Sequence, residues 1–270
     1  MLFRLIHRIE GQFSGLNYEL MNTAVKKAIY QTIDGITLRR GLSKAVNGET
    51  IRFKPEYFRY YPTNYEPIKQ KFLRERCIPE STVIDAGAHI GMYSVFMSKY
   101  VGASGRVVAF EPTPATRVQL ETMLKLNSCS NVEVRSEALW SKSGVKKFFD
   151  SLDPVSCVNG FADMATGMHY EVETLSLDEL NLTSVSCIKI DVEGSEIELL
   201  KGASSVISKY RPYMTMEVHP RNIRVLGSSL DNLWELLVSY GYYISIGNTI
   251  LDKEYFVHLE DICEVQLVAR

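Results

Sequence analysis

Acidic side chains and one histidine follow the apolar runs of this sequence at points suited to ligand chemistry. An apolar, β-branched run is typical of a buried strand, and the polar residue that ends it lies at a sheet edge. A carboxylate there can accept hydrogen bonds from hydroxyls or attract a cationic group, and a histidine can take a proton near neutral pH. These strand-end residues are Asp85, Glu111, Glu137, Asp191 and His219.

The turn after Asp85 has the composition of a nucleotide-binding loop. It reads Asp85-Ala86-Gly87-Ala88-His89-Ile90-Gly91 and leads into a helix predicted over 92–100. Glycine lets the backbone turn sharply and bring its N–H groups close to a ligand. The spacing does not fit G-x-G-x-x-G, and a carboxylate would repel a pyrophosphate. It would attract the amino group and sulfonium of S-adenosylmethionine (SAM). We therefore expect Asp85, Gly87, His89 and Gly91 to bind SAM rather than NAD.

Two further acids are expected to bind the nucleoside part of this cofactor. Glu111 follows a strand predicted over 106–110 and lies a little beyond the ~20 residues at which an acid receives a ribose. Glu137 belongs to the end of a strand predicted over 132–138, where the adenine amino group would lie. For each acid the alternative is an exposed turn residue without a ligand.

The reacting group is expected beside Asp191, in the segment Ile190-Asp191-Val192-Glu193-Gly194. Asp191 should face the methyl group or the methionine part of the cofactor, and Glu193 is a second catalytic candidate. Glu196 and Glu198 are interpreted as acids that stabilise the first turn of a helix against its dipole. His219 could take the proton of an acceptor hydroxyl. Its alternative is a histidine tied to a carboxylate in the pocket wall.

Strands and helices alternate along the chain, which predicts an α/β fold with a parallel sheet and helices on both faces. The last two strands are expected to close the sheet at an antiparallel end. The loop over 150–170 is a candidate lid, with Phe161, Met164, Met168 and His169 as acceptor contacts. Strands are predicted over 82–85, 106–110, 132–138, 145–149, 172–175, 185–190, 212–218, 242–246 and 263–268, and helices over 67–76, 92–100, 115–126, 195–201 and 230–240.

The first part of the chain is predicted as a helical, aromatic-rich extension over 1–80, followed by a catalytic domain over 81–270. A helical stripe with a basic face over 1–9 suits homo-oligomer assembly or peripheral membrane contact, with packing on its own domain as the alternative. A helix continues over 17–33, and a short strand is expected over 50–53. The aromatic run over 57–66 either lines a pocket or joins the extension to the main domain.

The totals limit the partners of the protein. A formal charge of −2 and a pI near 6.2 give no basic face for nucleic acid. Five widely spaced cysteines without a C-x-x-C pair indicate a reduced protein, and we expect a cytoplasmic location. No apolar run approaches the ~20 residues of a membrane-spanning helix.

Four motifs together are similar to those of the FkbM family of SAM-dependent methyltransferases. They are Val83-Ile84-Asp85-Ala86-Gly87-Ala88-His89-Ile90-Gly91, Ala109-Phe110-Glu111-Pro112, Ile188-Lys189-Ile190-Asp191-Val192-Glu193-Gly194-Ser195-Glu196 and Glu217-Val218-His219. The resemblance runs from about 65 to about 220. It implies a Rossmann-like class I methyltransferase fold, with a mostly parallel seven-stranded sheet.

The same resemblance implies transfer of the SAM methyl group to a hydroxyl of a small molecule, sugar or glycan. It does not cover the first fifty or so residues or the loop over 150–170, where we expect the acceptor to be selected. No metal is expected. One alternative is a metal-assisted O-methyltransferase in which Asp191, Glu193 and Glu217 hold Mg²⁺. Another is a non-catalytic SAM-binding module that assembles through its N-terminal helix.

Overall fold

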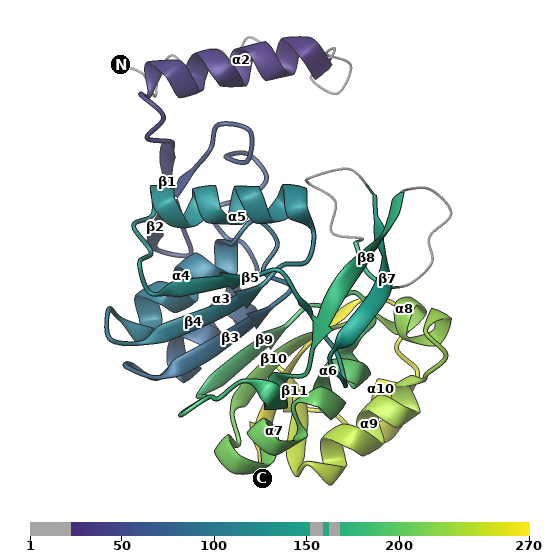
Figure 1. Cartoon of the computed structure of the whole chain (residues 1–270). Helices are drawn as coiled ribbons and strands as arrows, with labels where there is room; N and C mark the ends of the chain where they lie inside the picture. Colours follow the sequence, from purple (N-terminus) through teal and green to yellow (C-terminus); the bar gives the residue numbers. More distant parts are fainter. Residues whose placement is uncertain (1–22, 152–158, 162–167) are drawn as a thin grey trace.

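A computed structural model describes residues 23–151, 159–161 and 168–270 of the chain (Figure 1). The helix expected over 1–9 and the candidate contact Met164 lie outside these residues. No helix in the described ranges combines the length and hydropathy needed to cross a membrane.

The main sheet has eight strands in the order β12-β11-β13-β10-β9-β3-β4-β5. β10, β9, β3, β4 and β5 run parallel, and β13 is antiparallel to its neighbours β10 and β11. The expected sheet therefore forms, with the two-residue β12 as an eighth strand. The bounds are β3 Thr82–Ala86, β4 Arg106–Phe110, β5 Val132–Arg135, β9 Cys187–Ile190, β10 Tyr213–Val218, β11 Tyr242–Ile246, β12 Thr249–Ile250 and β13 Cys263–Ala269.

Alternating residues of the strands face two hydrophobic cores, as the two-residue period of a strand requires. Val83 and Val107 pack with α3 (Pro67–Arg76), α4 (Met92–Val101) and α5 (Pro114–Leu126). Ile84 and Val108 pack on the opposite face. The helices of that face are α6 (Glu196–Gly202), α7 (Ser204–Tyr210), α8 (Pro220–Val225), α9 (Leu230–Ser239) and α10 (Lys253–Val257).

A second, three-stranded sheet has the order β6-β8-β7, with β6 at Ala138–Leu139, β7 at Gly144–Asp150 and β8 at Met168–Leu175. Figure 1 shows β7 and β8 as a long antiparallel pair beside the main sheet. The prediction of one strand over 132–138 is therefore wrong, because the chain leaves the main sheet after Arg135 and Ala138 pairs with β8 instead. Met168 and His169 lie in β8 rather than in the predicted loop.

The N-terminal part begins with α2 (Thr23–Ile36), which Figure 1 shows set apart from the sheet beyond a hairpin of β1 (Leu42–Val46) and β2 (Glu49–Phe53). β1 was not predicted. Asn47 and Gly48 both have positive φ, 48° and 85°, as a two-residue hairpin turn requires. The Asn-Gly pair was the sequence signal for this hairpin. Buried residues of the hairpin share one core with α4 and α5, so residues from 42 onward pack as part of the main body.

Candidate active site

A pocket opens at the carboxyl ends of β3, β4 and β9. β4 and β9 lie on opposite sides of β3, so the strand order reverses here, and ligands bind at this kind of point in open α/β sheets. Its empty space is about 960 Å³, including the open mouth. Among the lining residues are Tyr61, Tyr65, Glu66, Gly87, His89, Tyr93, Glu111, Thr113, Leu139, Phe148, Asn159, Phe161, Lys189, Asp191 and Glu193.

The glycine turn forms one wall of this pocket. Gly87 has φ +77°, and a Cβ there would lie 1.7 Å from the carbonyl oxygen of Asp191, so no other residue fits. The N–H groups of Gly87 and Ala88 donate to the carbonyl of Phe110 at 3.1 and 2.8 Å. Gly91, at φ +92°, precedes α4 and packs against Leu120 outside the pocket lining. Gly87 therefore lies where it was expected, and Gly91 shapes the turn from behind.

Asp85 lies beneath the turn rather than in the pocket. Its side chain is fully buried and accepts a hydrogen bond from the hydroxyl of Ser94 at 2.5 Å. Nζ of Lys189 lies 3.5 Å from its second oxygen. Because Asp85 is an in-strand residue of β3, its side chain alternates with Ala86 and points into the layer between sheet and α4. This corrects the expectation that its carboxylate faces a ligand.

Lys189 is a site residue that the sequence reasoning missed. Its buried Nζ donates to the carbonyl of Gly87 at 2.7 Å and lies 3.2 Å from the carboxylate of Asp191. Burial lowers the pKa of Lys189, but the carboxylates of Asp191 and Asp85 outweigh it and raise that pKa. The available signal was a lysine inside the otherwise apolar strand Cys187–Ile190.

Glu111 lines the pocket with both carboxylate oxygens fixed. One accepts from the backbone N–H of His89 at 2.8 Å and the other from that of Thr113 at 2.9 Å. Burial raises the pKa of Glu111 despite these hydrogen bonds. His89 has φ +50°, and burial lowers the pKa of its imidazole. The buried Nε2 of His89 makes no hydrogen bond within the described ranges.

Glu137 does not reach the pocket. Its carboxylate pairs with the guanidinium of Arg135, two residues before it. The following residues Ala138 and Leu139 line the pocket instead. The chain turns out of the main sheet at this point, so the acid faces away from the position expected for adenine.

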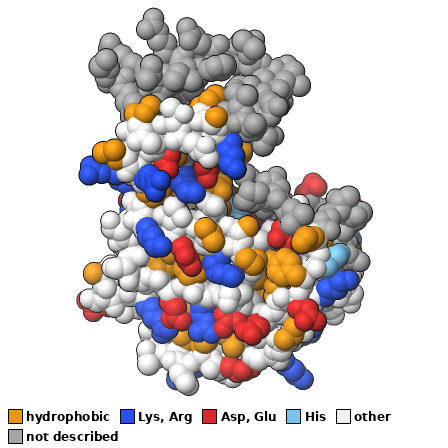
Figure 2. Space-filling view, turned by 45° about the horizontal axis from the view of Figure 1, so that its top comes forward, with side chains coloured by type: hydrophobic (Ala, Val, Ile, Leu, Met, Phe, Trp, Pro, Cys, Tyr) orange, Lys and Arg blue, Asp and Glu red, His pale blue; other side chains and the backbone are white. Residues whose placement is uncertain are grey.

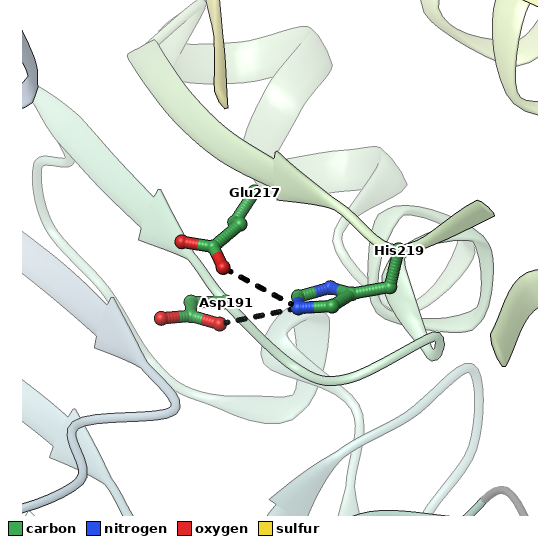
Figure 3. Close-up of side chains that lie close together, drawn as sticks. All are labelled: Asp191, Glu217 and His219. Carbon is green, nitrogen blue, oxygen red and sulfur yellow. Dashed lines mark ion pairs between the residues drawn. The ribbon is translucent and has the colours of Figure 1, made fainter. Parts of the chain in front are cut away.

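Four carboxylates surround the buried imidazole of His219, three of them near Nε2. Nε2 lies 3.9 Å from Asp191 Oδ1, 3.4 Å from Glu193 Oε2 and 3.5 Å from Glu217 Oε1. Figure 3 shows Asp191 and Glu217 both facing this nitrogen. On the other side of the ring, Nδ1 is hydrogen-bonded to Glu196 Oε1 at 2.8 Å.

These carboxylates decide the charge of the imidazole. Burial lowers the pKa of His219, but the neighbouring carboxylates of Glu193, Glu196 and Glu217 outweigh it and raise that pKa to about 12. In this arrangement the ring is protonated. This agrees with the alternative considered from sequence, in which His219 is tied to a carboxylate in the pocket wall and does not accept a proton. Glu196 was interpreted as a helix-terminal acid, yet it is fully buried and is the hydrogen-bond partner of this ring.

The loop between β9 and α6 holds Glu193 in an unusual conformation. Its φ is +52°, which is costly for a residue with a Cβ and is found mostly where function or packing demands it. The side-chain amide of Asn222, on α8, donates to both the carbonyl and the carboxylate of Glu193 at 3.2 Å. Glu193 thus lines the pocket with its side chain fixed from behind.

Lys69, on α3, is a second buried lysine that the sequence did not reveal. Its Nζ lies 2.9 Å from Glu66, 3.0 Å from Glu217 and 2.9 Å from Glu264. These carboxylates come from three different parts of the chain. Lys69 therefore ties the N-terminal segment to the end of β10 beside His219.

Aromatic rings form the remaining walls. Tyr61 stacks on Phe53 with ring centroids 5.4 Å apart, and Tyr65 meets Tyr61 edge-on at 4.9 Å. The aromatic run thus does both things considered from sequence, since it lines the pocket and joins the N-terminal segment to the core. On the opposite wall Phe161 packs edge-on against Trp140 and Phe148, at 4.6 and 5.2 Å.

Comparisons of the sequence and of the fold identify methyltransferases that are similar to this chain. The hexuronic acid methyltransferase AglP of Haloferax volcanii is 28% identical over 210 residues, which cover 73% of this chain and 84% of that protein. A protein named methyltransferase 1 from Beauveria bassiana is 27% identical, over 46% of this chain and 58% of its own length. A crystal structure of an FkbM methyltransferase from Methylobacillus flagellatus aligns with a TM-score of 0.48 at 18% identity, over 74% of this chain and 50% of that one.

The family assignment rests on a match to a family model. The sequence pattern described as the methyltransferase FkbM domain matches residues 85–244, which is more than half of the chain. The matched region begins at the glycine turn and includes β9, β10 and the cluster around His219. The protein is therefore a methyltransferase of the FkbM family.

Proposed function

We propose that this methyltransferase transfers the methyl group of SAM to a hydroxyl oxygen of a small molecule or glycan. The observation that carries the proposal is the turn at Gly87, where no Cβ fits, beside a carboxylate that two backbone N–H groups hold at the switch point of the sheet. A nucleoside with two ribose hydroxyls suits this arrangement.

The pocket residues fit the parts of SAM. Glu111 uses one acceptor position on each oxygen for the backbone, which leaves a position on each for a ribose hydroxyl. The unpaired Nε2 of His89 offers one further polar contact. Phe110 and Leu139 offer apolar surface for the base. When bound, SAM supplies an electrophilic methyl group.

The chain contributes mainly by positioning. Asp191 and Glu193 are held at the pocket wall by Lys189 and Asn222, and the acceptor hydroxyl is placed beside them. Aligning two reactants can supply ~7 to 11 kcal/mol of a barrier. We assign Asp191 and Glu193 to the acceptor side of the site, where their carboxylates orient the attacking hydroxyl, and His219 to a position behind them that fixes these carboxylates. The proton that the hydroxyl loses would pass to Glu193, whose pKa is raised by burial, while S-adenosylhomocysteine leaves.

The acceptor proposed is a sugar or sugar acid. The named activity of the Haloferax volcanii relative, hexuronic acid methylation, supports this class. Rings such as Tyr65 and Phe161 provide flat apolar surface in the same pocket. Nucleic acid is not proposed, because the formal charge is −2 and Figure 2 shows basic and acidic side chains interspersed over the face it draws. The free thiols of Cys77, Cys129, Cys187 and Cys263 support a reduced, cytoplasmic setting.

A transfer assay tests the proposal. Purified protein is incubated with methyl-labelled SAM and a panel of free sugars, hexuronic acids and their glycosides, and the products are analysed by mass spectrometry. Mild alkali then distinguishes the products, because a methyl ester loses its label and a methyl ether keeps it. We expect alkali-stable label on a hydroxylated acceptor. Alkali-labile label would overturn the hydroxyl assignment, and failure to bind S-adenosylhomocysteine (SAH) would overturn the cofactor assignment.

A further inference from the structure

The carboxylate oxygens nearest His219 converge on one point. Asp191 and Glu217 each use one oxygen for a lysine, with Lys189 Nζ at 3.2 Å and Lys69 Nζ at 3.0 Å, respectively. Their other oxygens face His219 Nε2, and the three ligand atoms lie within 4.8 Å of one another. Figure 3 shows the carboxylates of Asp191 and Glu217 facing the imidazole of His219. The lysines thus fix the outer oxygens and leave the inner oxygens directed at the ring.

The nitrogen at the centre of these oxygens has no hydrogen bond. His219 is only 2% exposed, and its Nε2 lacks a hydrogen-bond partner among the residues that the structure describes. A buried polar atom without a partner is costly and requires an explanation. The spacing supplies one. Two ligand atoms bound at ~2.1 Å to one tetrahedral ion lie about 3.4 Å apart. The oxygens of Glu193 and Glu217 lie 3.4 and 3.5 Å from Nε2, and that of Asp191 lies somewhat farther away, at 3.9 Å.

The other face of the ring is arranged as in metal sites. A histidine that binds a metal through one nitrogen usually donates its other N–H to a carboxylate, which fixes the tautomer and orientation of the ring. Here Nδ1 is hydrogen-bonded to the fully buried Glu196 at 2.8 Å. A metal ion would displace the proton from Nε2, and the proton on Nδ1 would stay hydrogen-bonded to Glu196.

The local charge also favours a cation. Asp191, Glu193, Glu196 and Glu217 surround the imidazole, while the described ammonium groups beside them belong to Lys69 and Lys189. Lys69 is in turn shared with two further carboxylates. Glu196 is fully buried and the other three carboxylates are partly buried, and carboxylates held together in this way are stabilised when they bind a cation.

We propose that Asp191, Glu217 and His219 bind one divalent transition-metal ion, with Glu193 as a further ligand. Carboxylates alone would suit Mg²⁺ or Ca²⁺, whereas an imidazole together with carboxylates suits Mn²⁺, Fe²⁺ or Zn²⁺. This differs from the expectation of no metal, and from the Mg²⁺ alternative in which Glu193 took the place of the histidine. Asp191 and Glu193 line the pocket, so the ion lies at its edge.

The ion would bind the oxygen atoms of the acceptor, and this part rests on the proposed function. The pocket edge beside it carries Glu66, Asp191 and Glu193, which would repel a sugar acid. A divalent ion with open coordination positions reverses that repulsion and orients a hydroxyl or carboxylate of the acceptor. The site would thereby select acceptors that present two oxygens to one metal.

Binding of Mn²⁺ tests the site directly. The full-length protein is stripped with EDTA, dialysed and titrated with MnCl₂, and free Mn²⁺ is followed by its electron paramagnetic resonance. We expect one ion per chain. Pulsed measurements on the bound ion should show coupling to a ¹⁴N nucleus from the imidazole, a signature that requires no variant. Absence of binding, or bound Mn²⁺ without ¹⁴N coupling, would overturn the proposal.

Variants then locate the ion. Glu217→Gln should weaken Mn²⁺ binding by more than tenfold, and Glu196→Gln by about 10- to 100-fold through loss of ring orientation. Glu198→Gln is the matched control, because Glu198 lies on α6 together with Glu196 but pairs with Lys201, outside the cluster around His219. Equal Mn²⁺ affinity in Glu217→Gln, Glu198→Gln and the wild type would exclude this site.

Calorimetry with SAH separates the two proposals. It is performed on the wild type with and without Mn²⁺. If the protein binds SAH but not Mn²⁺, the metal-site proposal is refuted and the methyl-transfer proposal stands. If the protein binds Mn²⁺ with ¹⁴N coupling but does not bind SAH, the metal-site proposal stands and the assignment of SAM as cofactor is refuted.

Discussion

Buried carboxylates in this protein differ in what holds them, and that difference decides which can meet a ligand. Asp85 accepts a hydrogen bond from Ser94, lies 3.5 Å from Nζ of Lys189 and does not line the pocket. Glu111 is fixed by backbone N–H groups and keeps free acceptor positions at the pocket. Two acids at neighbouring strand ends therefore differ in placement, since only Glu111 lines the pocket, even though their sequence contexts are alike.

The pH dependence of SAH binding should follow Glu111. Burial raises its pKa above the ordinary value, and ribose hydroxyls donate to the ionised form. Lowering the pH through this raised pKa protonates the carboxylate and weakens binding. Hydrogen bonds to a charged group contribute about 1.5 to 3 kcal/mol, so we expect roughly a 10- to 100-fold loss. Calorimetry between about pH 5 and pH 8 measures the SAH affinity over this change, because that range lies above the ordinary pKa of a glutamate side chain. Glu111→Gln should bind weakly with a flatter profile, and an unchanged slope in that variant would refute the assignment.

Replacing Lys189 should reveal the cost of uncompensated buried acids. Lys189→Met leaves Asp85 buried without its ammonium partner, and removal of one member of a buried pair costs about 3 to 5 kcal/mol. Urea unfolding measures this loss. The exposed Lys201, paired with Glu198, is the control, and Lys201→Met should change the unfolding free energy by about 0 to 1 kcal/mol. Adding Asp85→Asn to Lys189→Met should recover part of the loss, and a purely additive double variant would argue against the pairing.

At the scale of elements, the site depends on the close approach of the turn after β3 to the loop after β9. Asp191 donates its backbone N–H to the carbonyl of Ala86 at 3.0 Å, and its own carbonyl occupies the space that a Cβ at Gly87 would need. The end of β10 places Glu217 beside Asp191, because β9 and β10 are parallel neighbours with Ile190 opposite Met216. The strand register therefore positions the whole cluster.

Gly87→Ala tests this approach of two loops. The added Cβ would meet the Asp191 carbonyl at 1.7 Å, so the turn must shift and SAH binding should be lost. Gly48→Ala is a matched control, because Gly48 also has a positive φ of +85° but has open space around it. That variant should lose about 1 kcal/mol of stability and bind SAH normally. Calorimetry and thermal unfolding of both variants provide the comparison, and equal SAH affinity in the two would contradict the geometry.

At the scale of the whole molecule, two cores enclose the sheet, and the N-terminal hairpin belongs to one of them. Val46, Ile51 and Phe53 pack with residues of α4 and α5. Lys69 adds an electrostatic link from α3 to β10 and β13. The proposed extension over 1–80 thus contributes Tyr61, Tyr65 and Glu66 to the pocket, and these two tyrosines also pack in the core.

Ligand binding should stabilise the whole molecule in a cofactor-specific way. A ligand that binds only the folded state at 100 times its Kd adds ~2.7 kcal/mol, which raises the Tm of a chain of this size by about 5 to 10 °C. We expect this shift with SAH and none with NAD, because the glycine spacing of the turn does not fit the dinucleotide-binding pattern. Thermal unfolding with each ligand measures it. A shift with NAD but not with SAH would reverse the cofactor assignment.

The sequence by itself determined the local features of this protein. Apolar, β-branched runs predicted most strands of the main sheet, and helical periodicity predicted most of its helices, since both patterns depend only on near neighbours. The glycine turn, Glu111 and the Asp191 segment were also found there, because a strand end followed by glycine or acid is a local signal. The Asn-Gly hairpin was equally local and could have been predicted.

Only the tertiary structure decided which side chains meet. It directed Asp85 beneath the turn and Glu137 away from the pocket, and it brought Lys69, Lys189 and Glu196 to the site. It also moved Ala138 into a second sheet with β8. The physical reason is that strand order and register bring together residues far apart in the chain. Whether a charged side chain meets a partner or a ligand then depends on neighbours that no local pattern contains.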